Sequence, residues 1–167
     1  MQIDVSYDVF KLAQVFTISR GSRTEAKVLT VRLSDGAHSG WGECVPYARY
    51  DETMESVEAQ IRALPADVSR DALYDLLEPG AARNAVDCAL WDLEAKRAGK
   101  RVWELAGLSA PKPEITAYTL SLAEPEAMQK QASENAHRPL LKIKLGTPDD
   151  MPRLEAVRRG APNTFVL

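Results

Sequence analysis

The chain has 167 residues, a formal net charge of −3 and a hydrophobic fraction of 45%, values typical of a soluble globular protein. The mildly acidic balance gives no reason to expect a nucleic acid or an anionic membrane as partner. No apolar run approaches the roughly 20 residues that a membrane-spanning helix needs.

The cysteines and the N-terminus indicate a cytoplasmic protein. Cys44 and Cys88 lie far apart in apolar contexts without a CxxC pattern, so we expect two buried free thiols in a reducing compartment. The N-terminal stretch carries Asp4 and Asp8, and it lacks the basic region and apolar core of a signal peptide.

The first 45 residues carry the patterns of β-strands. β-branched and aromatic residues alternate in part over residues 3–18 and more strictly over residues 26–33. An Asp-Gly pair at 35–36 signals a hairpin turn, and we interpret the sequence GWG at 40–42 as a tight hairpin return. We therefore expect an antiparallel meander of about three strands, with a polar loop at 17–26 between the first two.

Beyond residue 50 the hydrophobic period becomes helical. Three helices are expected: one after Asp51 or Thr53, one capped by Ser69, and one over residues 81–98 that ends at Gly99. The apolar stripe of the third helix predicts a core contact. Strands followed by helices make residues 1–108 a small α+β domain.

After a proline-rich linker the chain alternates between strands and helices, which signals parallel βα units. The expected strands are 114–122, 140–146 and 163–167, and the expected helices are 124–137 and 148–160. Three strands and two helices cannot close a barrel of about 250 residues. Residues 109–167 are therefore expected to be the start of a (β/α) TIM-type barrel that is incomplete in this chain.

Two lysines interrupt the most hydrophobic short run of this second half. Side chains alternate along a strand, so Lys142 and Lys144 share one face while Leu141, Ile143 and Leu145 point to the covering helices. In a barrel the lysines would face the interior near the C-terminal end of the strand, where active sites lie. Crowded ammonium groups lose a proton more readily, and a neutral lysine can act as a general base. An edge strand with one face in water would carry the same pattern, so both interpretations stay open at this point.

Several segments resemble a known family. The meander and helical cap, "AARNAVDCALWDLEAKRAGK", "TAYTLSL" and "LLKIKLG" are similar to the enolase superfamily, in the branch of the muconate lactonising enzymes. Within that branch, "SRGSRTEAKV", "GWGECVPYARYDE" and "GAARNAVDCALWD" resemble the L-Ala-D/L-Glu dipeptide epimerases of bacterial cell-wall peptide recycling. The resemblance covers essentially the whole chain.

The resemblance implies an isomerase that epimerises L-Ala-D/L-Glu-type dipeptides by removing the proton α to a carboxylate, through an enediolate. Lys144 matches the catalytic acid/base of the family, and Lys142 matches the lysine that supports it and helps to bind the substrate carboxylate. Arg20 matches the arginine that pairs with the glutamate side chain of the substrate, and Thr119 matches a threonine at the substrate. Arg23 is the less favoured arginine.

The resemblance also implies Mg²⁺, which would hold the charge of the enediolate. The acidic metal ligands and the second base of the family come from later barrel strands, so we expect them beyond Leu167 and expect no metal site in this chain. The 167 residues alone are expected to be inactive. Residues 46–52 would form a second cap loop, with Tyr47 and Tyr50 as candidate lining residues.

Other functions share these features. Muconate-type cycloisomerisation and dehydration to o-succinylbenzoate use the same cap and lysine pair, although Arg20 favours a substrate with an acidic side chain. A further alternative, outside the enzymes, is that the chain is an inactive fragment or a binding module. A homo-oligomer also stays open.

Overall fold

The computed structural model describes residues 1–146, 148 and 150–167 of the chain. By its internal contacts the chain divides into two compact units. The first unit comprises Met1–Phe10 and Lys27–Pro111, and the second comprises Lys11–Ala26 and Lys112–Leu167. Residues 11–26, called the hairpin tip below, thus group with the second half of the chain, which a division into contiguous domains does not anticipate.

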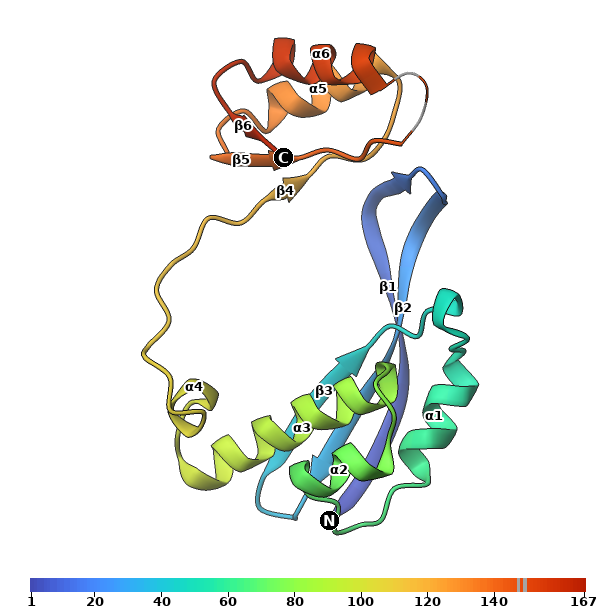
Figure 1. Ribbon diagram of the computed structural model, residues 1–167, viewed down its shortest axis with the longest axis vertical. Coiled ribbons are helices and arrows are strands. Elements are labelled where there is room, and N and C mark those ends of the chain that lie inside the picture. The colour runs from blue at the N-terminus through green and yellow to red at the C-terminus, as the bar shows by residue number, and fades with distance from the viewer. Residues whose placement is uncertain (147, 149) are drawn as a thin grey trace. The chain divides into compact units, whose positions relative to one another are not determined.

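The N-terminal half begins with a three-stranded sheet of β1 (Gln2–Ile18), β2 (Gly21–Ser34) and β3 (Ser39–Cys44), in the order β1-β2-β3 (Figure 1). β2 and β3 pair antiparallel, which confirms the predicted meander. The polar loop predicted at residues 17–26 is wrong, because β1 and β2 continue until only Ser19 and Arg20 form the turn. A hydrogen bond of 2.8 Å between the hydroxyls of Thr17 and Ser22 joins the strands beside that turn.

The predicted helices of the first unit are present. Thr53 caps the first of them and Ser69 the second, and the third ends at Gly99 in the left-handed conformation that glycine adopts without strain (φ 61°). Within the described residues, no helix is both long and apolar enough to cross a membrane. The helices are α1 (Met54–Arg62), α2 (Arg70–Leu76), α3 (Ala81–Ala98) and α4 (Val102–Leu105), with a 3₁₀ turn at Ala48–Tyr50.

The backbone of α3 lies directly against that of β3 (Figure 1). A Cβ atom on Gly42 would overlap the carbonyl of Ala85, and one on Gly40 would overlap the carbonyl of Ala89. The GWG sequence therefore lies inside β3 and serves helix–strand packing, which corrects its interpretation as a hairpin return. Trp41, between the two glycines, points away from the helix and is half exposed.

The core of the first unit lies between the sheet and the three longer helices. The predicted apolar stripe of α3 is buried there together with alternate residues of β2. This burial holds α3 against the sheet. The largest fully buried side chains of this core are Leu29, Val31, Leu33, Val57, Ile61, Leu73, Val86 and Leu93.

The second unit contains a three-stranded parallel sheet, β4 (Tyr118–Thr119), β5 (Leu140–Lys142) and β6 (Phe165–Val166), in the order β4-β5-β6. Two helices, α5 (Pro125–Glu134) and α6 (Asp150–Gly160), lie side by side (Figure 1). This arrangement confirms the predicted βα units, although the strands are shorter than expected. The predicted start of the last helix at 148–149 falls partly on residue 149, which lies outside the described residues. The part of the chain that the structure describes contains no closed barrel.

Two side chains differ from their predicted burial. Leu145 is 45% exposed because β5 has already ended, so the alternation that buries Leu141 and Ile143 does not reach it. Cys88 is exposed on the outer side of α3, whereas Cys44 is buried. Both thiols are free, as predicted.

Adding a methyl group at the β3–α3 contact should destabilise the fold strongly. In Gly42→Ala the new Cβ meets backbone atoms of α3, which cannot rotate away, so we expect a loss of about 3 kcal/mol or more in the free energy of unfolding. Glu43→Ala is the matched control, because Glu43 lies next to Gly42 with its side chain exposed, and it should change stability by about 0.5 kcal/mol or less. Denaturant unfolding measures both, and equal effects would contradict the packing argument.

Asp35 should make the first unit sensitive to acid. The backbone N–H of His38 (2.7 Å) and the guanidinium of Arg97 (2.6 Å) both donate to its carboxylate and lower its pKa from 3.8 to about 2. Because the folded pKa lies below the unfolded value, this stabilisation is complete above pH 3.8 and is lost as the pH falls through about 2. The free-energy difference between the protein and Asp35→Asn should therefore be constant well above pH 3.8, fall as the pH drops from 3.8 toward about 2, and disappear below that. A difference that is as large at pH 2 as at neutral pH would contradict this assignment.

Candidate active site

The lysine pair lies on the central strand of the second unit. Lys142 ends β5 and Lys144 follows two residues later; both are half-buried, while Leu141 and Ile143 are buried in the core on the other face. The Ile143 N–H donates to the Leu167 carbonyl (2.9 Å), so pairing continues past the end of β5. Since β5 lies between β4 and β6, the pattern does not belong to an edge strand of this sheet, and that alternative interpretation fails.

Thr119 is the neighbour of Lys142 across the sheet. The two residues are register partners in the parallel pair β4–β5, so their side chains extend from the same face of the sheet. The Leu120 N–H donates to the Lys142 carbonyl (2.8 Å) and fixes this register. Thr119 and Lys142, which the sequence selects separately, are thus brought together.

A hollow of about 410 Å³ lies between β4 and the hairpin tip. Its wall is mainly apolar, and among the described residues that line it Arg23 has the single charged side chain. Among the described residues, the side chains of Arg23 and Arg20 have no hydrogen-bond or ion-pair partner. The hollow is lined by Leu12, Ala13, Gln14, Phe16, Arg23, Ala26, Tyr118 and Thr119.

The structure thus gives Arg23 a place that the sequence did not favour. Both arginines read as polar loop residues in the sequence, and only the long pairing of β1 and β2 makes Arg23 a strand residue beside the hollow. Arg20 lies in the exposed turn and does not line the hollow.

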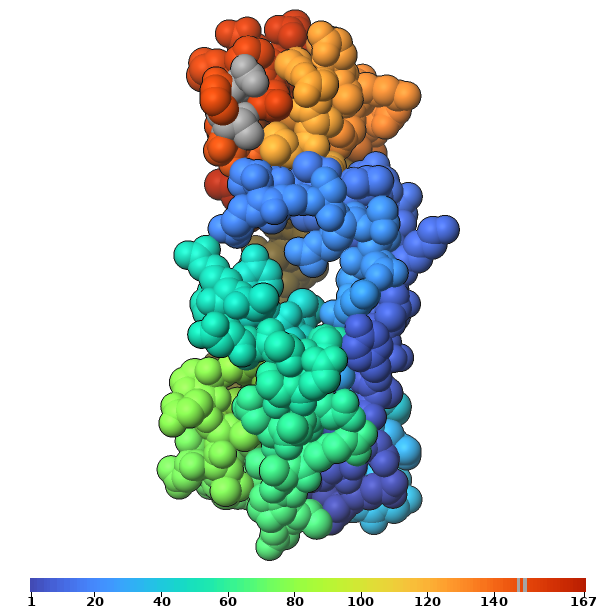
Figure 2. Space-filling view, turned by 90° about the vertical axis from the view of Figure 1, so that its right-hand side faces the viewer, coloured from blue at the N-terminus to red at the C-terminus, as the bar shows by residue number. Residues whose placement is uncertain are grey.

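The loop after the lysine pair reaches the hairpin tip close to Arg20. A Cβ atom built on Gly146, two residues after Lys144, would lie 3.5 Å from the Cβ of Ser19. Figure 2 shows the blue hairpin tip packed against the orange segment that follows β4. The second unit therefore contains all four predicted site residues, although only Thr119 lines the hollow directly.

The described residues include no group of three or more His, Cys, Asp or Glu side chains placed to share a metal ion. They do not fit a Mg²⁺ site, and we assign no chemical step of this chain to a metal.

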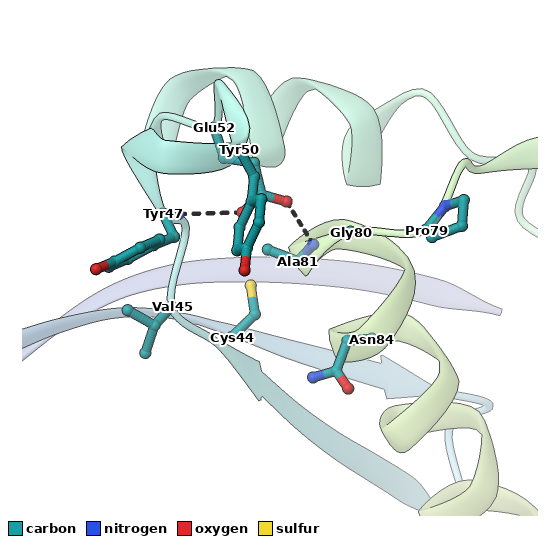
Figure 3. A pocket seen from close by; sticks show the side chains of 9 residues that line it. All are labelled: Cys44, Val45, Tyr47, Tyr50, Glu52, Pro79, Gly80, Ala81 and Asn84. Carbon is teal, nitrogen blue, oxygen red and sulfur yellow. Dashed lines mark hydrogen bonds between the residues drawn. The ribbon is translucent and has the colours of Figure 1, made fainter.

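A second hollow, of about 440 Å³, lies in the first unit (Figure 3). Glu52 accepts hydrogen bonds from the N–H groups of Tyr47 (3.0 Å) and Ala81 (2.6 Å), and so joins the 46–52 loop to the start of α3. Tyr47 and Tyr50 line this hollow with their ring centroids 5.8 Å apart. Burial raises the pKa of the Cys44 thiol at its base to about 11, so that thiol is protonated near neutral pH and is a poor nucleophile.

Residues 2–107 match the family model for the N-terminal domain of mandelate racemase / muconate lactonizing enzyme. The chain belongs to this family. L-Ala-D/L-Glu epimerase of Escherichia coli K12 is 39% identical over 99% of this chain and 53% of its own length. N-acetyl-D-glutamate racemase of a Pseudoalteromonas species is 39% identical over 82% of this chain and 45% of its own length. The chain therefore spans about half the length of these relatives.

Solved structures of this family agree with the fold. An enolase family member from Agrobacterium tumefaciens with homology to dipeptide epimerases, with bound sodium and L-Ala-L-Glu, is 51% identical and superposes with a TM-score of 0.93. That match covers 98% of this chain and 52% of the other. A dipeptide epimerase from Enterococcus faecalis V583, complexed with Mg and L-Leu-L-Tyr, is 26% identical with a TM-score of 0.85, over 99% of this chain and 51% of the other. The predicted fold, an α+β capping domain followed by the start of a barrel, is confirmed.

Proposed function

We propose that this chain forms the cap and the first part of the active site of a dipeptide epimerase that acts on L-Ala-D/L-Glu-type dipeptides. The main support for the proposal is that one compact unit contains the unpaired guanidinium of Arg23, the apolar hollow beside it, and the strand that carries Lys142 next to Thr119. The names of the relatives support the same reaction class. Both cysteines are free, which supports a cytoplasmic location.

The chemistry follows from the lysine pair. Lys144, in its neutral form, takes the proton from the carbon α to the carboxylate, and the electron pair of the broken C–H bond moves into the carboxylate to give an enediolate. The ammonium group of Lys142 offsets part of the additional negative charge. Epimerisation also requires a proton donor on the opposite face of that carbon. We assign this donor, together with a Mg²⁺ site, to the half of the longer relatives that this chain does not span.

Substrate selection is assigned to the hairpin tip. A guanidinium binds a carboxylate through two parallel hydrogen bonds, and low surrounding polarity strengthens such a pair. Arg23 would bind the side-chain carboxylate of the substrate while the apolar wall contacts its methylene groups. Arg20, in the adjacent turn, stays the candidate that the family resemblance implies.

Proton exchange in a chimera tests the reaction. In this chimera the chain replaces the matching half of the E. coli L-Ala-D/L-Glu epimerase, and ¹H NMR in D₂O follows the loss of the α-proton of L-Ala-L-Glu. We expect exchange, and we expect Lys144→Met to reduce it by about 10²–10⁴-fold because the general base is lost. Lys130→Met is the matched control, because the Lys130 side chain is 78% exposed on α5, and it should leave the rate unchanged. A folded chimera that binds the dipeptide without exchange would favour a binding module instead.

The two arginines can be separated by their substrates. Arg23→Ala in the chimera should raise the KM for L-Ala-L-Glu by about 10- to 100-fold, because a charge-assisted pair with the substrate is lost. The KM for L-Ala-L-Leu, which has no side-chain carboxylate, should stay constant. Arg20→Ala is the matched variant, and steady-state kinetics with both dipeptides measure both changes. If Arg20→Ala carries the larger KM effect, the assignment passes from Arg23 to Arg20.

A further inference from the structure

Ser121 lies two residues after Thr119 and is buried, with 6% of its surface exposed. We propose that Ser121 is a positioning residue whose hydroxyl fastens the hairpin tip to the segment after β4, and so holds Arg23 at the hollow beside Thr119. The proposal rests on the proposed function, because substrate binding at that hollow is what the fastening would serve.

Three hydrogen bonds join the hairpin tip to this segment. The Ser121 hydroxyl donates to the Val15 carbonyl (3.2 Å) and accepts from the Thr17 N–H (2.9 Å), and the Leu122 N–H donates to the Thr17 carbonyl (3.0 Å). β1 is an edge strand of its sheet, so these backbone groups would otherwise have no partner. The Ser121 hydroxyl thus takes the place of a neighbouring strand for β1, although Ser121 lies more than 100 positions further along the chain.

The backbone of Ser121 is held from its other side by α5. The Ser121 N–H donates to Oε1 of Gln131 (3.1 Å), and Nε2 of Gln131 donates to the Ser121 carbonyl (3.4 Å). α5 is itself anchored in the core of the second unit by Met128 and Ala132, both fully buried. Ser121 therefore connects a fixed helix to the hairpin tip, and its hydroxyl has little freedom to take another partner.

The alternation of side chains places Ser121 on the face of the site. Leu120 points into the core, so its neighbours Thr119 and Ser121 extend from the opposite face, toward the hairpin tip. Thr119 lines the hollow, and Ser121, two residues later, bonds to the hairpin tip that forms the opposite wall. The same short segment thus supplies both a wall of the hollow and the attachment of the opposite wall.

A path of direct contacts connects Ser121 to Arg23. The backbone of Thr17 is held by Ser121 and Leu122, and the hydroxyl of Thr17 bonds to that of Ser22 at 2.8 Å. Ser22 immediately precedes Arg23 in β2. Loss of the Ser121 hydroxyl would leave Thr17 attached through the Leu122 hydrogen bond alone, and so would loosen the strand whose hydroxyl contact to Ser22 precedes Arg23.

Amide hydrogen exchange of the 167-residue chain, followed by NMR, tests the attachment without reference to activity. Ser121→Ala should speed exchange of the Thr17 amide by about tenfold, the effect of one lost hydrogen bond, while amides of α3 stay unchanged. Ser121→Thr keeps the hydroxyl and should restore the original rate. Ser133→Ala, on the exposed surface of α5, is the matched control and should change nothing.

Two results of this experiment would overturn the proposal. One is an unchanged Thr17 amide in Ser121→Ala. The other is faster exchange spread evenly over the second unit, including Met128 and Ala132, which would mean a general loss of stability. If Ser121→Ala does not fold, Ser121→Cys replaces it: the weaker hydrogen bonds of a thiol should give an intermediate exchange rate at Thr17, and an unchanged rate overturns the proposal.

Kinetics of the chimera separate positioning from a merely structural role. Ser121→Ala should raise the KM for L-Ala-L-Glu by about tenfold with kcat constant within about twofold, and Ser121→Thr should rescue it. Combined with Arg23→Ala, it should add no further increase, because Ser121 acts through Arg23. Additive KM effects, or a fall in kcat alone, would overturn the proposal. A chimera that never exchanges protons would overturn the proposed function, and the amide exchange data would then decide the role of Ser121 by themselves.

Discussion

The close contact between β3 and α3 is the constraint on which the N-terminal half depends. Gly40 and Gly42 have no side chain, so the helix backbone can lie on the strand and bury its apolar stripe against the sheet. β3 in turn pairs with β2 over six residue pairs, and β2 continues beyond the first unit to the hairpin tip. The absence of side chains at these two glycines thus sets how the sheet and α3 of the first unit pack together.

In the second unit, the side chains alternate between the two faces of the sheet, so that core residues lie on one face and the candidate site residues on the other. Leu120, Leu141 and Ile143 fill the core beneath α5 and α6, and the residues between them point to the opposite face. That face carries Thr119, Ser121 and the two lysines. Because the strand period is two, a shift of one residue in register would bury the lysines and expose the leucines, so the core that stabilises this unit also determines which groups the site receives.

The sequence predicts those features that depend on neighbouring residues. The caps of α1 and α2, the glycine that ends α3 and the alternation around Lys142 are all local patterns, and the structure contains them. Features that depend on residues far away in the chain cannot be predicted in this way. β1 extends to residue 18, near which its backbone bonds to Ser121, more than 100 residues away, and the sequence of this stretch taken alone therefore predicts a polar loop. The GWG sequence has meaning only once α3 lies against it.

The choice between Arg20 and Arg23 has the same physical origin. Both are exposed arginines in a polar stretch, and a charge in an exposed turn cannot be told apart from a charge beside an apolar wall by sequence alone. A guanidinium in water gains little from pairing with a carboxylate, whereas one beside apolar side chains loses less to competing water. Arg23 has that environment because Phe16 and Ala26 come from the same hairpin. Under the proposed function, selectivity is assigned to the hairpin tip and proton transfer to Lys144, two residues after β5, so each could vary while the other is retained.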